Sequence, residues 1–301
     1  MAARGTPVWL EVALNGPWGP AKQPRAPYSI ADCVAEGIAC ARAGAAVIHV
    51  HAFDPDSGRQ SDDWRTYARI IEGVRAEVDA IVYPTLPFNG AEGHGGGLSV
   101  QARYAHTVEL ARRGLIEWSV VDPGTVHIAD LAGVAADRPG FTYSNPEDHA
   151  REGLRLAAEY GFHPGYAIYE PGFLRFGAAL AARYADAPQA VYRLMFSDRF
   201  SFGYPPRSYA LDAYRALLAD CAPGAPWMIA GLQVDLRALI PEAVAAGGHV
   251  RVGLEDAPLG LDIRNPALAE EAAGLIQAAG GRPASAAEIR AALETPPRSP
   301  I

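Results

Sequence analysis

Two histidines and one glutamate have the types and spacing of a site for a divalent metal ion. His49 and His51 are separated by one residue inside an apolar run, and Glu255 ends another apolar run. Two imidazoles and a carboxylate supply three metal ligands and leave positions for water or substrate. Zinc is the first candidate, with iron and manganese as alternatives. Such an ion would act as a Lewis acid on a carbonyl group.

A carboxylate next to this set is a candidate general base. Asp256 directly follows Glu255, and Arg251 precedes them in the same run, where it could keep Asp256 ionised and oriented. A Lewis acid beside a carboxylate base suits removal of a proton from the carbon next to a carbonyl. Two alternatives stay open. His49 and His51 could be core histidines without a ligand role, and Arg251 with Asp256 could be a simple loop ion pair.

These residues fall on strands of a predicted (β/α)₈ TIM barrel, an α/β fold. Eight strand-like runs alternate with helix-like segments along 301 residues, which predicts a single barrel domain over residues 1–301. An open doubly wound sheet is the alternative, but the first turn lacks its GxGxxG fingerprint. The strands are expected at Val8–Leu14, Ala45–His51, Ala80–Pro84, Ile116–Val121, Tyr166–Glu170, Ala190–Phe196, Trp227–Ala230 and His249–Leu254.

A short segment follows the eighth strand–helix unit. We expect a C-terminal helical extension over Ala286–Leu293. The residues after it, Thr295–Ile301, are rich in proline and are expected to be a flexible tail.

Strand parity predicts that the three candidate ligands converge. Successive side chains of a strand point to opposite faces, and in a barrel these faces are the helices and the lumen. The apolar residues of the second and eighth strands suit the helix side, which turns His49, His51 and Glu255 into the lumen near its C-terminal end. Alternate strands of a barrel fill the same side-chain layers. The parity therefore favours a metal site over two core histidines.

The same parity turns two polar residues of the first strand into the lumen. Asn15 precedes a glycine at the end of the strand and is a candidate hydrogen-bonding residue for a substrate carboxylate or carbonyl, or else a turn residue. Glu11 lies deeper and is interpreted as a structural carboxylate, because a buried carboxylate needs a partner. His249 or Arg251 could supply that partner.

Composition and charge exclude several classes of function. Half of the residues are hydrophobic, a fifth are charged and the formal net charge is −8, with no basic block that would suit nucleic acid or an anionic membrane. No apolar run is long enough to span a membrane, and no signal pattern precedes the first strand. The three cysteines have no metal-ligand spacing. We therefore expect a cytoplasmic protein with free thiols.

Two sequence runs resemble the β-keto acid cleavage enzymes, the family typified by 3-keto-5-aminohexanoate cleavage enzyme. They are GAAVIHVHAFDPDSGRQSDD (Gly44–Asp63) and the more specific GGHVRVGLED (Gly247–Asp256), and the likeness extends from about Val8 to Leu293. The resemblance implies a (β/α)₈ barrel that forms homotetramers. It also implies a reaction of a β-keto acid with acetyl-CoA that gives acetoacetate and a new acyl-CoA through a metal-stabilised enolate.

The resemblance also implies roles for individual residues. It assigns zinc binding to His49, His51 and Glu255, and an arginine–aspartate dyad to Arg251 and Asp256. Further residues at positions that contact substrate in the family are Trp18, Thr85, Asp122 and Thr125.

Departures from the family pattern concern the substrate and the thioester. Trp18 replaces the acid that binds the amino group of the aminohexanoate, so we do not expect the 5-amino compound as substrate. Only a hydroxyl, at Thr85, remains of the Ser-Thr-Gly-Gly that the family has after its third strand. The segment Gly231–Leu236 lacks the basic residue associated with the thioester partner. One alternative is therefore a CoA-independent, metal-dependent lyase or hydrolase acting on a keto acid. A remoter alternative is a non-catalytic barrel that binds a small acid.

Overall fold

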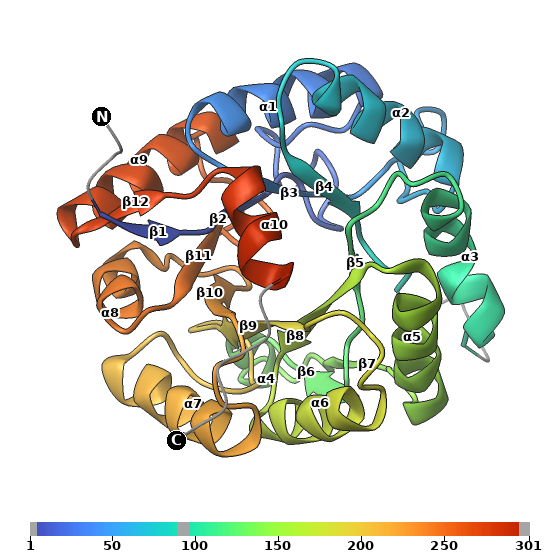
Figure 1. Cartoon of the computed structure of the whole chain (residues 1–301). Coiled ribbons are helices and arrows are strands. Elements are labelled where there is room, and N and C mark those ends of the chain that lie inside the picture. Colours follow the sequence, from blue (N-terminus) through green and yellow to red (C-terminus); the bar gives the residue numbers. More distant parts are fainter. Residues whose placement is uncertain (1–4, 89–96, 295–301) are drawn as a thin grey trace.

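The protein is a (β/α)₈ barrel. The computed structural model describes residues 5–88 and 97–294 (Figure 1). Its eight parallel strands are β2 (Leu10–Ala13), β3 (Val47–Val50), β4 (Ile81–Pro84), β5 (Trp118–Val120), β8 (His163–Ile168), β9 (Val191–Phe196), β10 (Trp227–Gly231) and β11 (His249–Val252). They are ordered β4-β3-β2-β11-β10-β9-β8-β5, so the described sheet closes almost completely, with β4 and β5 at its two edges. Each strand overlaps a predicted one, which confirms the barrel and excludes the doubly wound sheet.

Helices follow the strands and form the outer ring (Figure 1). The larger ones begin at side-chain caps where the sequence supplies them: Ser29 accepts from the backbone N–H of Asp32, and Asp63 accepts from that of Arg65. Their apolar faces pack on the strands and bury a continuous core between the two layers. The ring consists of α1 (Ile30–Arg42), α2 (Trp64–Arg75), α3 (Val100–Ala111), α5 (Glu147–Tyr160), α6 (Pro171–Arg183), α7 (Ser208–Cys221), α8 (Ile240–Ala245) and α9 (Asn265–Ala278).

Two further pieces lie outside the eightfold pattern at the ends of the described chain. The short strand β1 (Thr6–Val8) pairs in parallel with β12 (Gly281–Pro283). The helix α10 (Ala286–Glu294) then lies across the barrel opening in Figure 1, which confirms the predicted C-terminal helical extension. The predicted flexible tail, Thr295–Ile301, lies outside the described residues, and the single domain over residues 1–301 stays a prediction.

The connection after β5 carries structure that the sequence reading missed. It contains a two-stranded antiparallel hairpin of β6 (Val126–Ile128) and β7 (Phe141–Tyr143), with the short helix α4 (Leu131–Val134) between them. Three-residue strands are too short for alternation to identify them. This hairpin matters because it brings aromatic side chains to the C-terminal end of the barrel, where the predicted site lies.

One finding concerns membranes. In the described part of the chain, no helix has the length and apolar character needed to cross a bilayer.

Candidate metal centre and active site

The structure brings the three predicted metal ligands together at the C-terminal end of the barrel. The Nε2 atoms of His49 and His51 each lie 3.4 Å from Oε2 of Glu255. One ligand atom from each residue falls within 4.8 Å of the other two. Both histidines are buried, and the Glu255 side chain is 12% exposed. This convergence is what strand parity predicts for His49, His51 and Glu255.

The chemistry of these donors fits a cation. Nε2 of His51 and Oε2 of Glu255 are buried and have no hydrogen-bond partner among the described residues. The Nδ1 atom of His51 lies 2.8 Å from Oε1 of Gln60. An Nδ1–H that donates to this amide oxygen leaves the lone pair on Nε2, as in metal sites where a second residue orients the histidine. A divalent ion would bind these atoms, whose burial without a partner otherwise costs stability.

Electrostatics keeps His49 and Glu255 in the forms that bind metal. Burial lowers the pKa of His49 well below 6.5, so its imidazole is neutral. Burial alone would raise the pKa of Glu255, but the Arg251 guanidinium beside it outweighs burial and holds this pKa well below 4.5. A neutral imidazole and an ionised carboxylate are the states that coordinate a cation.

A glycine allows the chain to place Glu255 beside the first barrel strand, β2. Gly253 follows β11 with φ +133°, and a Cβ atom there would lie 2.1 Å from the carbonyl oxygen of Ala13. Directly after this close approach, the backbone N–H of Glu255 donates to the same carbonyl at 3.2 Å. The indole Nε1 of Trp18 donates to the backbone oxygen of Glu255 at 2.8 Å. The glycine therefore fixes where the carboxylate of Glu255 enters the lumen.

Arg251 joins three carboxylates below the candidate metal centre. Its Nε and Nη2 donate to Oδ2 and Oδ1 of Asp256 at 2.9 and 2.7 Å. Nη2 also lies 3.0 Å from Oε1 of Glu255, and Nη1 donates to Oε1 of Glu11 at 3.0 Å. Glu11 thus has the structural partner predicted for it. Burial raises the pKa of Asp256 to about 6, although Arg251 opposes the shift.

A cavity of about 130 Å³ opens onto this centre. Its polar lining includes the three candidate ligands, Arg251, Arg193 and Asp122. Its apolar and aromatic lining comes mainly from Trp18, Leu86, Phe88, Phe141, Tyr143 and Tyr169. Asp256 is not in this lining. It borders a smaller cavity of about 60 Å³, and Arg251 borders both cavities.

The predicted substrate contacts divide into two groups. Trp18, Thr85 and Asp122 line the cavity. Asn15 and Thr125 do not. The Asn15 amide accepts from the N–H of His51 and donates to the carbonyl of the same residue, both at 2.9 Å, so its visible role is to hold His51 in place.

Thr125 is exposed, and its hydroxyl accepts from the N–H of Asn145 at 2.9 Å. Substrate binding by Asn15 or Thr125 stays a prediction.

Four polar residues of the cavity lining were missed by sequence reasoning. Tyr143 comes from the unpredicted hairpin, and its hydroxyl donates to Oδ2 of Asp122 at 2.5 Å. Gln60 lies in a loop that no periodic pattern marks, and Tyr169 lies in a predicted strand, where no role was assigned to it. Arg193 did carry a signal, because it is a lone charge inside the apolar strand β9.

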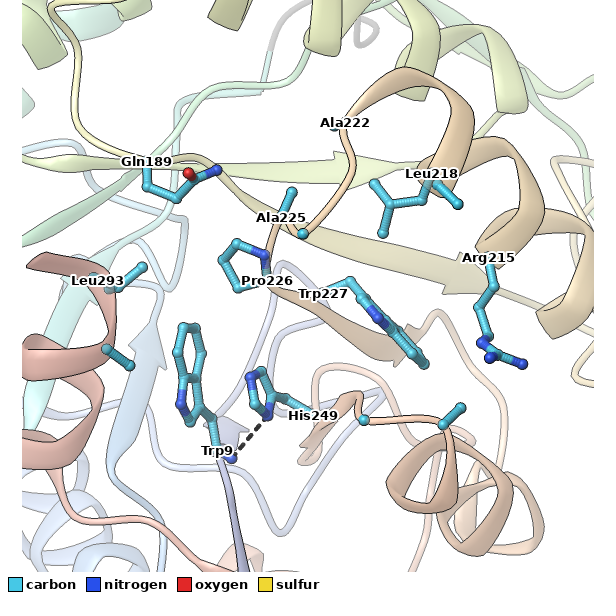
Figure 2. Close-up of a pocket in the computed structure, with 15 residues that line it drawn as sticks. Trp9, Gln189, Arg215, Leu218, Ala222, Ala225, Pro226, Trp227, His249 and Leu293 are labelled. Atoms are coloured by element: carbon cyan, nitrogen blue, oxygen red, sulfur yellow. Dashed lines mark hydrogen bonds between the residues drawn. The ribbon is translucent and has the colours of Figure 1, made fainter. Parts of the chain in front are cut away.

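A second, larger cavity of about 470 Å³ lies at the N-terminal end of the barrel, since it borders the first residues of β10 and β11 (Figure 2). Trp9 and His249 stack there with ring centroids 4.1 Å apart, and the N–H of Trp9 donates to Nδ1 of His249 at 3.2 Å. The lining contains no carboxylate among the described residues. We therefore place the chemistry at the C-terminal end, where TIM-barrel active sites are found.

His249 makes stability depend on pH. Burial lowers its pKa from 6.5 to about 3 in the folded protein. The unfolded chain therefore takes up this proton first, and stability that is complete above pH 6.5 is lost as the pH falls towards 3. The wild-type protein is expected to lose up to about 2 kcal/mol of unfolding free energy between pH 7 and pH 5 because of His249. His249→Asn keeps an acceptor for the Trp9 N–H and should not show this part of the loss. Parallel denaturant titrations would measure it, and identical pH dependence in both proteins would contradict it.

Comparison with known proteins places these motifs in one family. The family model for beta-keto acid cleavage enzyme matches residues 7–294. The 3-oxoadipate:acetyl-CoA acetyltransferase of Cupriavidus necator is 27% identical over 300 residues, covering 96% of this chain and 95% of that protein. The 3-dehydrocarnitine:acetyl-CoA trimethylamine transferase of Rhizobium meliloti is 25% identical, covering 90% and 89%.

A solved structure supports the fold alone. The binary complex of ObcA with oxaloacetate has a TM-score of 0.68 at 16% sequence identity, and the match covers 90% of this chain and 67% of ObcA.

Proposed function

The chain belongs to the β-keto acid cleavage enzyme family, and on that premise we propose that it converts a β-keto acid and acetyl-CoA into acetoacetate and a new acyl-CoA. One observation supports this most strongly. The family match spans residues 7–294, and the three candidate ligands lie on a cavity together with the Arg251 guanidinium.

We propose that His49, His51 and Glu255 hold the metal ion, with zinc as its identity. Two imidazoles and a carboxylate are a donor set that catalytic zinc accepts. When bound, the ion would supply Lewis-acid stabilisation of negative charge that develops on the keto oxygen of the substrate. Asn15 and Gln60 support this role by orienting His51 from its backbone and its Nδ1 atom.

Asp256 is the proposed base, and Arg251 positions it. Asp256 takes the proton from the carbon between the keto and carboxylate groups of the acid. That carbon then attacks the acetyl thioester, and CoA leaves as the thiolate. The thiolate attacks the original keto carbon, the carbon–carbon bond breaks, and acetoacetate leaves with the proton that Asp256 returns. Support comes from the two hydrogen bonds that fix Asp256 on Arg251 and from a pKa near 6, which suits proton transfer near neutral pH.

The side chain of the acid is proposed to be apolar and uncharged. Trp18 uses its only donor, Nε1, on the backbone of Glu255, so it presents an apolar ring to the cavity. Phe88 and Phe141 line the cavity with ring centroids 5.6 Å apart. A charged tail would lose its hydration against these rings without gaining a partner. Thr85 and Asp122 remain proposed polar contacts for the reacting end of the acid.

One observation favours acetyl-CoA over the CoA-independent lyase or hydrolase. The segment 231–236 lacks a basic residue of its own, but Arg199 from the loop after β9 donates to Oε1 of Gln233 in that segment. Both Nε and Nη2 of Arg199 donate to Oδ2 of Asp130, at 2.8 and 2.7 Å. An arginine that is paired with Asp130 therefore lies beside this segment in place of the missing basic residue, which supports acetyl-CoA as the second substrate.

Assembly and location follow as further proposals. Leu131, Val134 and Phe141 are between 41 and 55% exposed on α4 and β7, and such exposed apolar side chains support association into a homotetramer. All three cysteines are unpaired, which supports a reducing, cytoplasmic location.

The reaction can be tested directly. Metal-loaded protein would be incubated with acetyl-CoA and a panel of β-keto acids that differ only in their side chains, and mass spectrometry would detect acetoacetate and new acyl-CoA. Apolar side chains are expected to give the fastest product formation. Consumption of a keto acid without any acyl-CoA would favour the CoA-independent enzyme, and no consumption with bound metal would favour the non-catalytic barrel.

A further inference from the structure

An arginine closes the floor of the cavity from the side opposite the candidate metal centre. Arg193 is the third residue of β9, is 2% exposed and lines the cavity. Its guanidinium reaches across the lumen: Nη1 donates to the hydroxyl of Tyr83 on β4, and Nη2 donates to the carbonyl of Gly165 on β8 at 2.9 Å. The ring of Tyr83 lies 4.6 Å from that of His49, centroid to centroid. Arg193 thus places a positive charge in the lumen, bonded to the tyrosine whose ring packs beside His49.

The protein pairs this charge with one carboxylate, at ion-pair rather than hydrogen-bond distance. The carboxylate nearest to Arg193 is Glu11, whose Oε1 lies 3.7 Å from Nη1, beyond hydrogen-bond distance. The same oxygen is already engaged at closer range by Arg251 at 3.0 Å and by the hydroxyl of Tyr83 at 2.6 Å. Burial raises the pKa of Tyr83 well above 10, so this phenol is neutral. Within the described residues, Nε of Arg193 has no partner.

Small residues on the neighbouring strand β8 leave room for the guanidinium. A Cβ atom on Gly165 would lie 2.9 Å from Nη2 of Arg193, so only glycine fits there without displacing it. Ala167, two residues later on the same face of β8, also lines the cavity and adds only a methyl group. The floor is therefore shaped around Arg193.

We propose that Arg193 binds the carboxylate of the acid substrate, an inference that rests on the proposed function. A buried arginine with an unused Nε–H costs stability unless an anion compensates it. A carboxylate matches the planar edge of a guanidinium and can accept two parallel hydrogen bonds from it. Binding at this floor selects acids over neutral ketones and holds the acid between Arg193 and the metal ligands.

A purely structural role is the rival explanation, in which Arg193, Tyr83 and Glu11 form a network that only fills the lumen. Glu11→Gln is the matched control, because it perturbs this network although Glu11 does not line the cavity. Arg193→Gln removes the charge, and Arg193→Lys keeps the charge but loses the planar fork. Circular dichroism and thermal melting would establish that each variant folds.

The decisive measurement compares two small ligands of the same shape. Calorimetry on metal-loaded protein would give the Kd of acetoacetate and of its neutral isostere acetoacetamide. We expect the wild-type protein to prefer acetoacetate, and Arg193→Gln to lose roughly 10- to 100-fold of that preference, as for a hydrogen bond to a charged group. Arg193→Lys should lose less, and Glu11→Gln should keep most of the preference. In turnover, the KM for the acid should rise while the KM for acetyl-CoA stays unchanged.

Three outcomes would overturn the proposal: an unchanged preference in Arg193→Gln, an equal loss in Glu11→Gln, or failure of both Arg193 variants to fold. The test of this proposal can be separated from the test of the proposed reaction. A preference for acetoacetate that depends on Arg193, without acyl-CoA formation by any acid, would keep this inference and reject the proposed reaction. Acyl-CoA formation with an unchanged KM for the acid in Arg193→Gln would do the reverse.

Discussion

Replacing Glu255 by alanine is expected to abolish stoichiometric metal binding and, with it, formation of acyl-CoA. Glu255 supplies the only anionic donor of the candidate set, and its Oε2 lies 3.4 Å from Nε2 of both histidines. Loss of a residue that only orients a ligand weakens metal binding 10- to 100-fold, so loss of a ligand should cost at least about 100-fold. His49→Ala should behave in the same way. Elemental analysis of dialysed protein would measure metal per chain.

Matched variants separate loss of the ion from loss of the fold. The barrel should remain folded in Glu255→Ala, because Arg251 keeps its contacts with Glu11 and Asp256. His163→Ala removes a histidine from the N-terminal end of β8, away from the candidate metal centre, and should keep one metal per chain. Gln60→Ala should lose metal only partly, because it removes the partner of His51 Nδ1 and not a ligand. One equivalent of metal retained in both Glu255→Ala and His49→Ala would reject the ligand assignment.

The metal centre was predictable because it depends on strand parity, a local property. His49 and His51 need only the two-residue repeat of a strand, and Glu255 needs only the last strand of a closed barrel to lie near the second. The barrel itself follows from eight alternating units, each with an apolar strand long enough to recognise. These features lie within short windows of sequence, so one chain suffices to identify them.

The remaining cavity residues depend on tertiary structure. Asn15 has the parity predicted for it, but its amide is taken up by His51 and Pro27, which come close only after folding. Tyr143 reaches Asp122 through a hairpin whose strands are three residues long. Arg193 stands in an apolar strand, but the contacts that make it part of the cavity come from β4 and β8. Patterns within a single sequence do not reveal such contacts.

Asp256→Asn is expected to keep the metal and the fold but to lower turnover roughly 10²- to 10⁴-fold, the usual contribution of a positioned base. Asparagine preserves the shape and one acceptor for Arg251, but it cannot take up a proton at neutral pH. Arg251 lines the larger cavity and Asp256 does not, so the experiment must separate a role as base from a role in positioning. The readout is exchange of the acid's α-protons in D₂O without acetyl-CoA, followed by NMR and corrected for the enzyme-free rate.

This half-reaction isolates proton removal from the later carbon–carbon bond steps. If Asp256 is the base, Asp256→Asn should exchange no faster than buffer, while metal content and acid binding stay at the wild-type level. Asp122→Asn tests the alternative base, since Asp122 is a buried carboxylate that lines the cavity and accepts from Tyr143 and from the N–H of Ala167. Exchange at the wild-type rate in Asp256→Asn would remove Asp256 from the chemistry. If Asp122→Asn then lost exchange, the base would be on β5's side of the cavity, and Arg251 with Asp256 would serve only to position Glu255.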